Sequence, residues 1–249
     1  RTEEALLDIS LADDLLLLVI AESAETSAQK MHKLAAVALD TMTEHGLQVN
    51  LEPNKTEVVF AFRGKGAPEC RRQTHFHNGN QLVVDTTHSG QREIHVTYEY
   101  KHLGTWTHET GRMSQAIAEG FCKARAAMRP IQKTVLCNPQ FAVKSRVDLA
   151  TSLVLSKPLF NAHVWPQLNK GETKKFNIGV NDIYRKVAGH ITTTNNANHY
   201  DNEGICIFLQ VALPQELLTC ARLRFWRRLL LYGPPETMAL MKTEFAWQD

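Results

Sequence analysis

The sequence lacks several features that define common protein classes. Within its 249 residues, no uninterrupted apolar run approaches the roughly 18 residues of a membrane-spanning helix, no glycine-rich phosphate loop occurs, and no signal-peptide pattern opens the chain. The five cysteines are scattered and include no Cys-x-x-Cys pair. These absences argue against a membrane protein and a disulfide framework, and they favour free thiols in a reducing, intracellular compartment, either nucleus or cytoplasm.

The net charge of +2 conceals an uneven distribution of charge along the chain. Residues 1–60 hold 4 Lys and Arg against 11 Asp and Glu, whereas residues 112–186 hold 13 against 4. An acidic segment that could hold metal ions thus precedes a basic segment that could bind phosphates. With 43% apolar residues, the chain has the composition of a globular protein with one large domain or two small ones.

Two adjacent carboxylates, Asp13 and Asp14, stand between apolar segments near the start of the chain. Burying them as ions is costly unless a cation compensates, and hard oxygen ligands favour Mg²⁺ or Mn²⁺. Within one strand the two side chains would point to opposite faces, so a turn is needed to bring both to one metal site. Residues 4–20 are therefore predicted to form two short strands with the Asp pair at a hairpin tip.

The same stretch also fits the start of a helix. Ser10 and Asp13 have the spacing of a capping box, in which Ser10 would be the N-cap and Asp13 a poorer substitute for Glu. A long helix would then run from Leu11 to Glu44. This alternative leaves the two carboxylates without a metal-binding role.

Hydrophobic periodicity predicts a mixture of helices and strands downstream. Residues 22–44 carry apolar side chains at spacings of three and four, which predicts an amphipathic helix closed by Gly46. Residues 63–81 and 189–204 are predicted loops. The predicted strands lie at 47–51, 57–62, 81–84, 93–98 and 102–107. Further predicted helices run from Met113 to a point before Pro130, and over 141–155, 173–187 and 216–232.

Three sequence blocks occur in a fixed order. They are Leu-Ala-Asp-Asp-Leu-Leu-Leu at 11–17, Gly-Leu-Gln-Val-Asn at 46–50 with Asn-Lys-Thr-Glu-Val-Val-Phe at 54–60, and Tyr-Lys-His-Leu-Gly at 100–104. This order and spacing resemble the palm of reverse transcriptases from non-LTR retrotransposons. The resemblance covers about residues 5–108 and extends more loosely to about 232. One departure is Leu11, where the family usually has an aromatic residue.

The resemblance implies a reaction and roles for individual residues. The reaction is RNA-templated addition of deoxynucleotides to a DNA primer by two metal ions, which Asp13 and Asp14 would help to hold. Lys55 would lie near the phosphates of the incoming deoxynucleotide triphosphate and could protonate the leaving group. The primer grip would include Tyr100, Leu103 and Gly104.

The basic helical region resembles the polymerase thumb, which holds a template–primer duplex through its phosphates. Plain solvation of the outer faces of a helical bundle is the simpler explanation for any single basic helix. The cationic residues expected to bind RNA template and DNA primer are Lys123, Arg125, Arg129, Lys133, Lys144, Arg146, Lys174 and Lys175.

The expected fold class is α+β, the C-terminal part of a palm followed by a mostly helical thumb. The expected divisions are a partial palm at 1–108, a basic thumb-like region at 109–188, and a loop with a helical tail at 189–249. The family needs a further metal-binding Asp and fingers upstream, so we expect the chain to be an incomplete polymerase whose partner is the N-terminal half. Two alternatives stay open: a non-catalytic retroelement remnant that binds nucleic acid, and a structural α+β domain.

Overall fold

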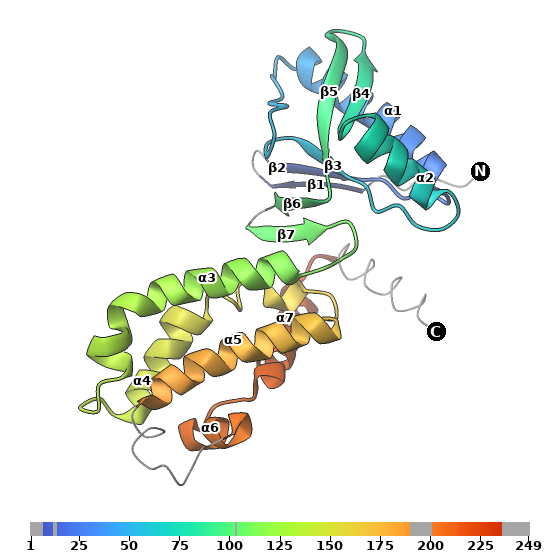
Figure 1. Ribbon diagram of the computed structural model, residues 1–249. Coiled ribbons are helices and arrows are strands. Elements are labelled where there is room, and N and C mark those ends of the chain that lie inside the picture. The colour runs from blue at the N-terminus through green and yellow to red at the C-terminus, as the bar shows by residue number, and fades with distance from the viewer. Residues whose placement is uncertain (1–6, 12–13, 103, 190–200, 236–249) are drawn as a thin grey trace. The chain divides into compact units, whose positions relative to one another are not determined.

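The protein has an α+β fold (Figure 1). The computed structural model describes residues 7–11, 14–102, 104–189 and 201–235. The chain divides into two compact units, Arg1–Arg112 and Met113–Asp249. The division falls close to the boundary predicted after residue 108.

The first unit opens with a two-stranded antiparallel hairpin. Strand β1 (Leu7–Leu11) pairs with β2 (Asp14–Leu18), and Leu11 lies opposite Asp14. The two predicted strands are confirmed, and the alternative helix from residue 11 is wrong. The helix instead begins at Ala24, where the Ser23 side chain accepts a hydrogen bond from the backbone N–H of Thr26 at 3.1 Å. A true N-cap is therefore present 13 residues later than the Ser10 alternative required.

Helix α1 (Ala24–Glu44) follows the predicted amphipathic pattern. Ala24, Ala35 and Leu39 are buried on one face. The helix ends at Glu44, and Gly46, whose φ is 75°, lies two residues beyond it. The backbone N–H groups of Gly46 and Leu47 reach back to the carbonyls of Thr43 and Met42, both at 2.9 Å, which closes the last turn as a Schellman motif.

A three-stranded sheet packs against α1. Its strands are β3 (Glu57–Val59), β5 (Gly90–Thr97) and β4 (Gln81–Thr86), in the order β3-β5-β4. The pair β4–β5 is antiparallel and β3–β5 is parallel. Buried and exposed residues alternate along β4, so one face of the sheet builds the core with α1.

Two predictions for the segment between α1 and β4 are wrong. Residues 47–51 do not form a strand, because they join no sheet, although Val49 and Leu51 pack against the core. The predicted loop 63–81 contains helix α2 (Ala67–Arg72) and a π-helical turn, η1 (Gln73–His77). Gly66 supplies the left-handed residue before α2, with φ of 81°, and Pro68 fits the first turn of a helix.

The last elements of the unit form a second small hairpin. Strand β6 (Glu99–His102) pairs antiparallel with β7 (Thr105–His108). Gly104 lies between the strands with φ of 78°. The sequence analysis predicted one strand over 102–107, and this prediction is wrong because the chain turns between β6 and β7. Glycine adopts the positive φ at position 104 without steric cost.

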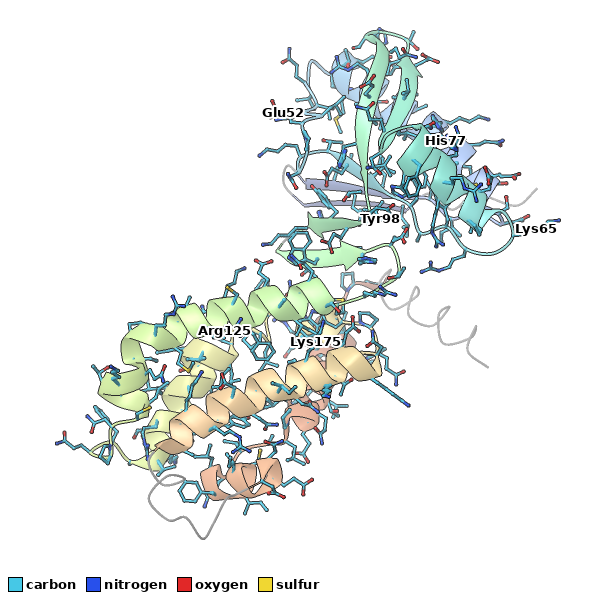
Figure 2. The ribbon with its side chains drawn as sticks, in the orientation of Figure 1. Glu52, Lys65, His77, Tyr98, Arg125 and Lys175 are labelled. Carbon is cyan, nitrogen blue, oxygen red and sulfur yellow. The ribbon has the colours of Figure 1, made fainter. Side chains whose placement is uncertain are left out.

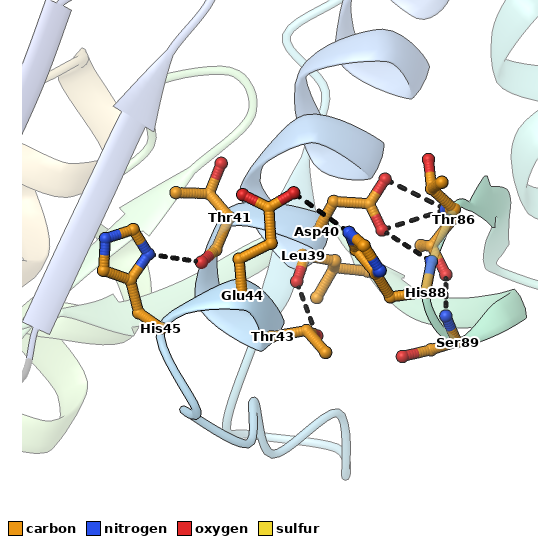
Figure 3. Close-up of polar contacts among 10 residues, drawn as sticks. Leu39, Asp40, Thr41, Thr43, Glu44, His45, Thr86, His88 and Ser89 are labelled. Atoms are coloured by element: carbon orange, nitrogen blue, oxygen red, sulfur yellow. Dashed lines mark hydrogen bonds and ion pairs between the residues drawn. The ribbon is translucent and has the colours of Figure 1, made fainter.

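Asp40 fixes the β4–β5 turn to helix α1 (Figure 3). Its carboxylate accepts hydrogen bonds from the backbone N–H of Thr87 at 2.9 and 3.0 Å and of His88 at 3.2 Å. The Nε2 of His88 lies 2.9 Å from Glu44 Oε1. The Thr87 hydrogen bond is the main cause that lowers the pKa of Asp40 below its ordinary value of 3.8.

We expect the stability contributed by Asp40 to depend on pH. Because the folded pKa is lower than the unfolded value, this contribution is present above 3.8 and disappears as the pH falls through the folded pKa. Asp40→Asn should therefore lower the thermal midpoint at pH 7, and the gap to wild type should narrow at pH 3. Asp85→Asn, on the exposed side of β4, should leave the midpoint unchanged at both pH values. A gap that stays constant with pH would contradict the role given to the ionised carboxylate.

The second unit is helical. Helix α3 (Ser114–Ile131) continues into the π-helical turn η2 (Gln132–Leu136), and α4 (Val143–Leu149) into η3 (Ala150–Leu155). After a 3₁₀ turn, η4 (Ala162–Val164), come α5 (Lys170–Ala188), α6 (Asn202–Leu209) and α7 (Pro214–Tyr232). Pro130 lies inside α3, which corrects the predicted end, and α6 begins within the last residues of the predicted loop 189–204.

Helix α5 is central to the core of this unit. Phe176 is fully buried and lies between two aromatic rings, with ring centroids 5.8 Å from Phe121 and 6.3 Å from Trp165. Residues of α6 and α7 belong to the same hydrophobic cluster, so the segment after residue 200 packs together with the basic helices. Among the described residues, no single helix is long and apolar enough to span a membrane. The pair α6 and α7, bent by 57°, reaches the length and apolar composition of a span only when the two helices are taken together.

Candidate functional site

The Asp-Asp hairpin places Asp14 at the first position of β2. Its pairing with Leu11 leaves Ala12 and Asp13 as the connecting residues, and Asp13 lies outside the residues that the structure describes. Within the described part of the chain, no three His, Cys, Asp or Glu side chains gather as a metal-ligand set. The carboxylate chemistry of the pair nevertheless suits a hard cation.

Strand β2 and the segment just after it expose apolar side chains. Leu15, Leu16 and Leu18 are 39%, 40% and 45% exposed, and Ile20 is 69% exposed. A two-stranded hairpin is marginally stable alone and needs a further strand or helix to cover its apolar residues. The hairpin therefore has the surface of an element that packs against another polypeptide segment.

A hydrogen bond joins the Lys55 turn to the β6–β7 hairpin. Lys55 is exposed in a turn that follows Asn54, whose φ is 66°. The hydroxyl of Tyr100 donates to the backbone carbonyl of Lys55 at 2.7 Å. Two of the three sequence blocks thus meet in the fold. Gly104 is placed in the hairpin turn, and Leu103 lies outside the described residues.

Aromatic side chains flank this hairpin. Tyr98 stacks on His75, with ring centroids 3.9 Å apart, so one face of its ring is already occupied. Lys101 lies over the ring of Trp106, with Nζ 5.6 Å from the centroid. Tyr98 is labelled in Figure 2 on the first unit.

Seven of the eight predicted nucleic-acid-binding cations are exposed. Figure 2 labels Arg125 on α3 and Lys175 on α5. Lys123 is partly neutralised, because its Nζ lies 2.7 Å from Glu119. The exposed set comprises Lys123, Arg125 and Arg129 on α3, Lys133 in η2, Lys144 on α4, and Lys174 and Lys175 on α5.

Arg146 is the exception and is a structural residue. It is only 4% exposed, and its guanidinium donates to the carbonyls of Leu136 at 3.2 Å and Val187 at 3.0 Å. The two carbonyls belong to the last turns of η2 and α5, so Arg146 links the C-terminal ends of these two elements by hydrogen bonds. Its burial and these two hydrogen bonds indicate a structural role in place of the predicted phosphate contact.

Comparison of the chain with protein-family models, with curated proteins and with solved structures gave no match. The functional argument therefore depends on the chain's own residues.

The structure adds site residues that the sequence analysis did not select. Asn177 and Asn181 lie one turn apart on α5 and line a groove with Lys170 and Lys174. Asparagine is a poor residue for a helix interior, because its side chain competes for backbone hydrogen bonds. A pair of asparagines four residues apart within a predicted helix, close to lysines, is the sequence feature that could have revealed this face of α5.

Proposed function

We propose that the chain is the C-terminal palm and thumb portion of an RNA-directed DNA polymerase similar to those of non-LTR retrotransposons. The observation that carries the proposal is the meeting of two motif blocks through the Tyr100 hydroxyl and the Lys55 carbonyl. The first hairpin, α1, β3 and the β6–β7 hairpin occur in the order of the palm that the sequence resembles, with α2, η1 and the β4–β5 hairpin between β3 and β6.

The residues of the first hairpin fit the metal that such a polymerase uses. Asp13 and Asp14 would hold Mg²⁺ through carboxylate oxygens, the ligands that this ion prefers. When bound, Mg²⁺ stabilises negative charge on the transferring phosphoryl group. Lys55 would bind the phosphates of the incoming deoxynucleotide, because its exposed ammonium is a compact cation. Gly104 would let the hairpin backbone approach the primer strand closely.

The complete polymerase would need a further polypeptide segment. It would supply another metal-binding carboxylate and cover the apolar residues that β2 exposes. The N-terminal half of a palm, with its fingers, has both properties. Its substrates would be an RNA template, a DNA primer and deoxynucleotide triphosphates.

A second candidate function is nucleic-acid binding without catalysis. The seven exposed cations of the second unit favour it, because phosphate binding requires neither the carboxylate pair nor the Lys55 turn. The two candidates make the same prediction for binding and opposite predictions for primer extension.

Binding should depend on salt as expected for phosphate contacts. Log affinity for B-DNA should fall linearly with log salt, with a slope of about −0.9 for each phosphate neutralised. Lys144→Gln and Lys174→Gln should each make this slope shallower by about 0.9 if each lysine neutralises one phosphate. The slope is measured by fluorescence anisotropy with a labelled duplex of arbitrary sequence.

Lys65→Gln is the matched control for this series. Lys65 is an exposed lysine in the first unit, labelled in Figure 2, and it belongs to no proposed contact. Its replacement should leave the slope unchanged. Binding that does not respond to salt, or no binding at low salt, would contradict both candidate functions.

A further inference from the structure

Helix α7 exposes large apolar side chains along its second half. Leu223, Leu230 and Leu231 are 62%, 64% and 59% exposed, and Tyr232, the last residue of the helix, is 80% exposed. Leu230 and Leu231 follow Leu223 by seven and eight residues, so the three leucines lie on one side of the helix. Single exposed leucines are common on protein surfaces, but three on one stripe indicate a surface that packs against another molecule.

Arginines lie between and beside these leucines. Arg224, Arg227 and Arg228 are exposed, and their positions fall within the same arc of the helix. Among the described residues, no acidic side chain forms an ion pair with any of the three guanidinium groups. This stripe is called the α7 face, and it consists of Leu223, Arg224, Arg227, Arg228, Leu230 and Leu231.

The sequence around the α7 face contains no negative charge. Residues 217–235 include four arginines and no Asp or Glu. The turn η4 packs against α7, and residues 149–171, which include η4, also contain no acidic residue. The charge of this surface therefore favours a partner that carries negative charge.

The opposite side of α7 is fixed to the helical unit. The ring of Phe225 packs on that of His163 in η4, with ring centroids 4.4 Å apart. The guanidinium of Arg222 donates to the backbone carbonyls of Trp165 at 3.1 Å and Pro166 at 3.0 Å. The α7 face is therefore preformed, so a partner does not have to order this helix when it binds.

The composition of the α7 face favours a protein partner over nucleic acid or a membrane. Phosphate binding does not require leucines, and bases stack on aromatic rings or guanidinium planes instead. A helix that lies in a membrane surface separates its apolar and charged faces, whereas Arg227 lies between Leu223 and Leu231 on the helix circumference. Arginines bind carboxylates through two parallel hydrogen bonds, so leucines interleaved with arginines suit an acidic protein helix.

We propose that the α7 face docks an acidic amphipathic helix of a partner protein. Leu223 and Leu230, about two turns apart, would pack against apolar side chains of the partner. Arg227, with Arg224 and Arg228 beside it, would bind the partner's Asp and Glu carboxylates. This inference goes beyond the proposed function, because none of the residues proposed for primer extension or duplex binding lies on α7.

The experiment measures binding of three labelled helical peptides to the full chain by fluorescence anisotropy. The acidic probe is three repeats of Leu-Ala-Ala-Leu-Glu-Ala-Glu, which places a leucine stripe between glutamates and disfavours pairing of the probe with itself. One control peptide has Lys in place of every Glu, and the other has Gln in place of every Leu. The acidic probe should bind roughly tenfold more tightly than either control, because only the probe offers both apolar contacts and carboxylates.

Two variants test the two components of the α7 face. Leu230→Gln removes an apolar contact and should weaken binding of the acidic probe roughly fivefold to tenfold. Arg227→Gln should weaken it to a similar extent and also make binding less dependent on salt. Both side chains are exposed, so the thermal midpoint should stay at its wild-type value.

Ile207→Gln on α6 and Arg92→Gln on β5 are the matched controls. Each replaces an exposed residue of the same chemical class outside the α7 face. Both should leave the affinity for the acidic probe unchanged. Equal binding of the acidic probe and its Gln control, or unchanged affinity in both Leu230→Gln and Arg227→Gln, would overturn the proposal.

Other occupants of the α7 face predict different results, each without binding of the acidic probe. Cosedimentation with phosphatidylserine vesicles that is lost in Leu230→Gln would overturn the proposal in favour of a membrane. A dimer in analytical ultracentrifugation that dissociates in Leu230→Gln would overturn it in favour of a second copy of this chain. Weaker duplex binding in Arg227→Gln would overturn it in favour of nucleic acid.

Discussion

Asp13→Asn should abolish primer extension by a polymerase assembled from this chain and a matching N-terminal half. Asparagine keeps the shape of the side chain but removes a negative charge from the expected metal site. Loss of one preorganised electrostatic contact lowers rates by roughly 100-fold to 1,000-fold, and loss of a metal ligand should reach at least the upper end. The readout is extension of a labelled DNA primer on an RNA template with Mg²⁺.

Controls separate loss of chemistry from loss of folding or binding. Asp13→Asn should keep the thermal midpoint and the salt-dependent affinity for duplex, because the two side chains have the same shape and the expected duplex contacts lie in the second unit. Asp148→Asn, an exposed aspartate on α4, should extend primers at the wild-type rate. The unjoined chain should not extend primers. Extension by the joined Asp13→Asn variant would contradict the role of Asp13, and extension by the unjoined chain would contradict the need for another carboxylate.

Arg146→Met should destabilise the second unit strongly without changing nucleic-acid binding. Methionine keeps much of the aliphatic stem but supplies no donor, so the carbonyls of Leu136 and Val187 lose their Arg146 hydrogen bonds. Unpaired buried acceptors cost about 1–3 kcal/mol each, which predicts a loss of roughly 3 kcal/mol in the free energy of unfolding. Urea denaturation of the full chain measures this change.

Lys144→Met, two residues earlier on the same helix, is the matched comparison. Lys144 is exposed, so its replacement should change the free energy of unfolding by no more than about 0.5 kcal/mol. It should nevertheless make the salt dependence of binding shallower. Arg146→Met should therefore change stability and leave binding unchanged, whereas Lys144→Met should change the salt dependence of binding and leave stability nearly unchanged. A stable Arg146→Met protein with a shallower salt dependence would restore the binding role predicted from sequence.

The long periodic segments were predictable because their apolar spacing coincides with a buried face. The stripe of α1 packs on the sheet as its spacing indicates, and Phe176 on α5 is fully buried. The hairpin around Asp14 was also predictable, since a turn was needed between two apolar runs. Its exposed leucines could not be anticipated, because exposure depends on which segments cover them.

Short elements were missed where local residues suggested irregular structure. Gly66 and Pro68 indicated a loop, but in the fold they begin helix α2. Pro130 indicated a helix end, because proline disfavours a helix interior. Helix α3 nevertheless continues past Pro130, and the residues Met128 and Leu136 on either side of it are both buried in the core. In each case tertiary packing decided between two structures that the local sequence allowed.

The candidate site was predictable only at the level of charge and motif. The sequence could not distinguish the buried Arg146 from the exposed Lys144, although both lie in one helix. It also gave no reason to place the Lys55 turn beside Tyr100, because a hydrogen bond across 45 residues has no local signature. The amide pair of α5 became visible only when its unpaired oxygens could be located.

Glu172 links the beginnings of two helices that lie far apart in the sequence. Its buried carboxylate accepts from the backbone N–H of Met113 at 2.7 Å, just before α3, and from that of Asn169 at 3.1 Å, at the N-cap of α5. The first turns of α3 and α5 therefore cannot fray separately, since opening either one exposes a carboxylate on which the other depends. In native-state hydrogen exchange, we therefore expect these two ends to open as a single unit.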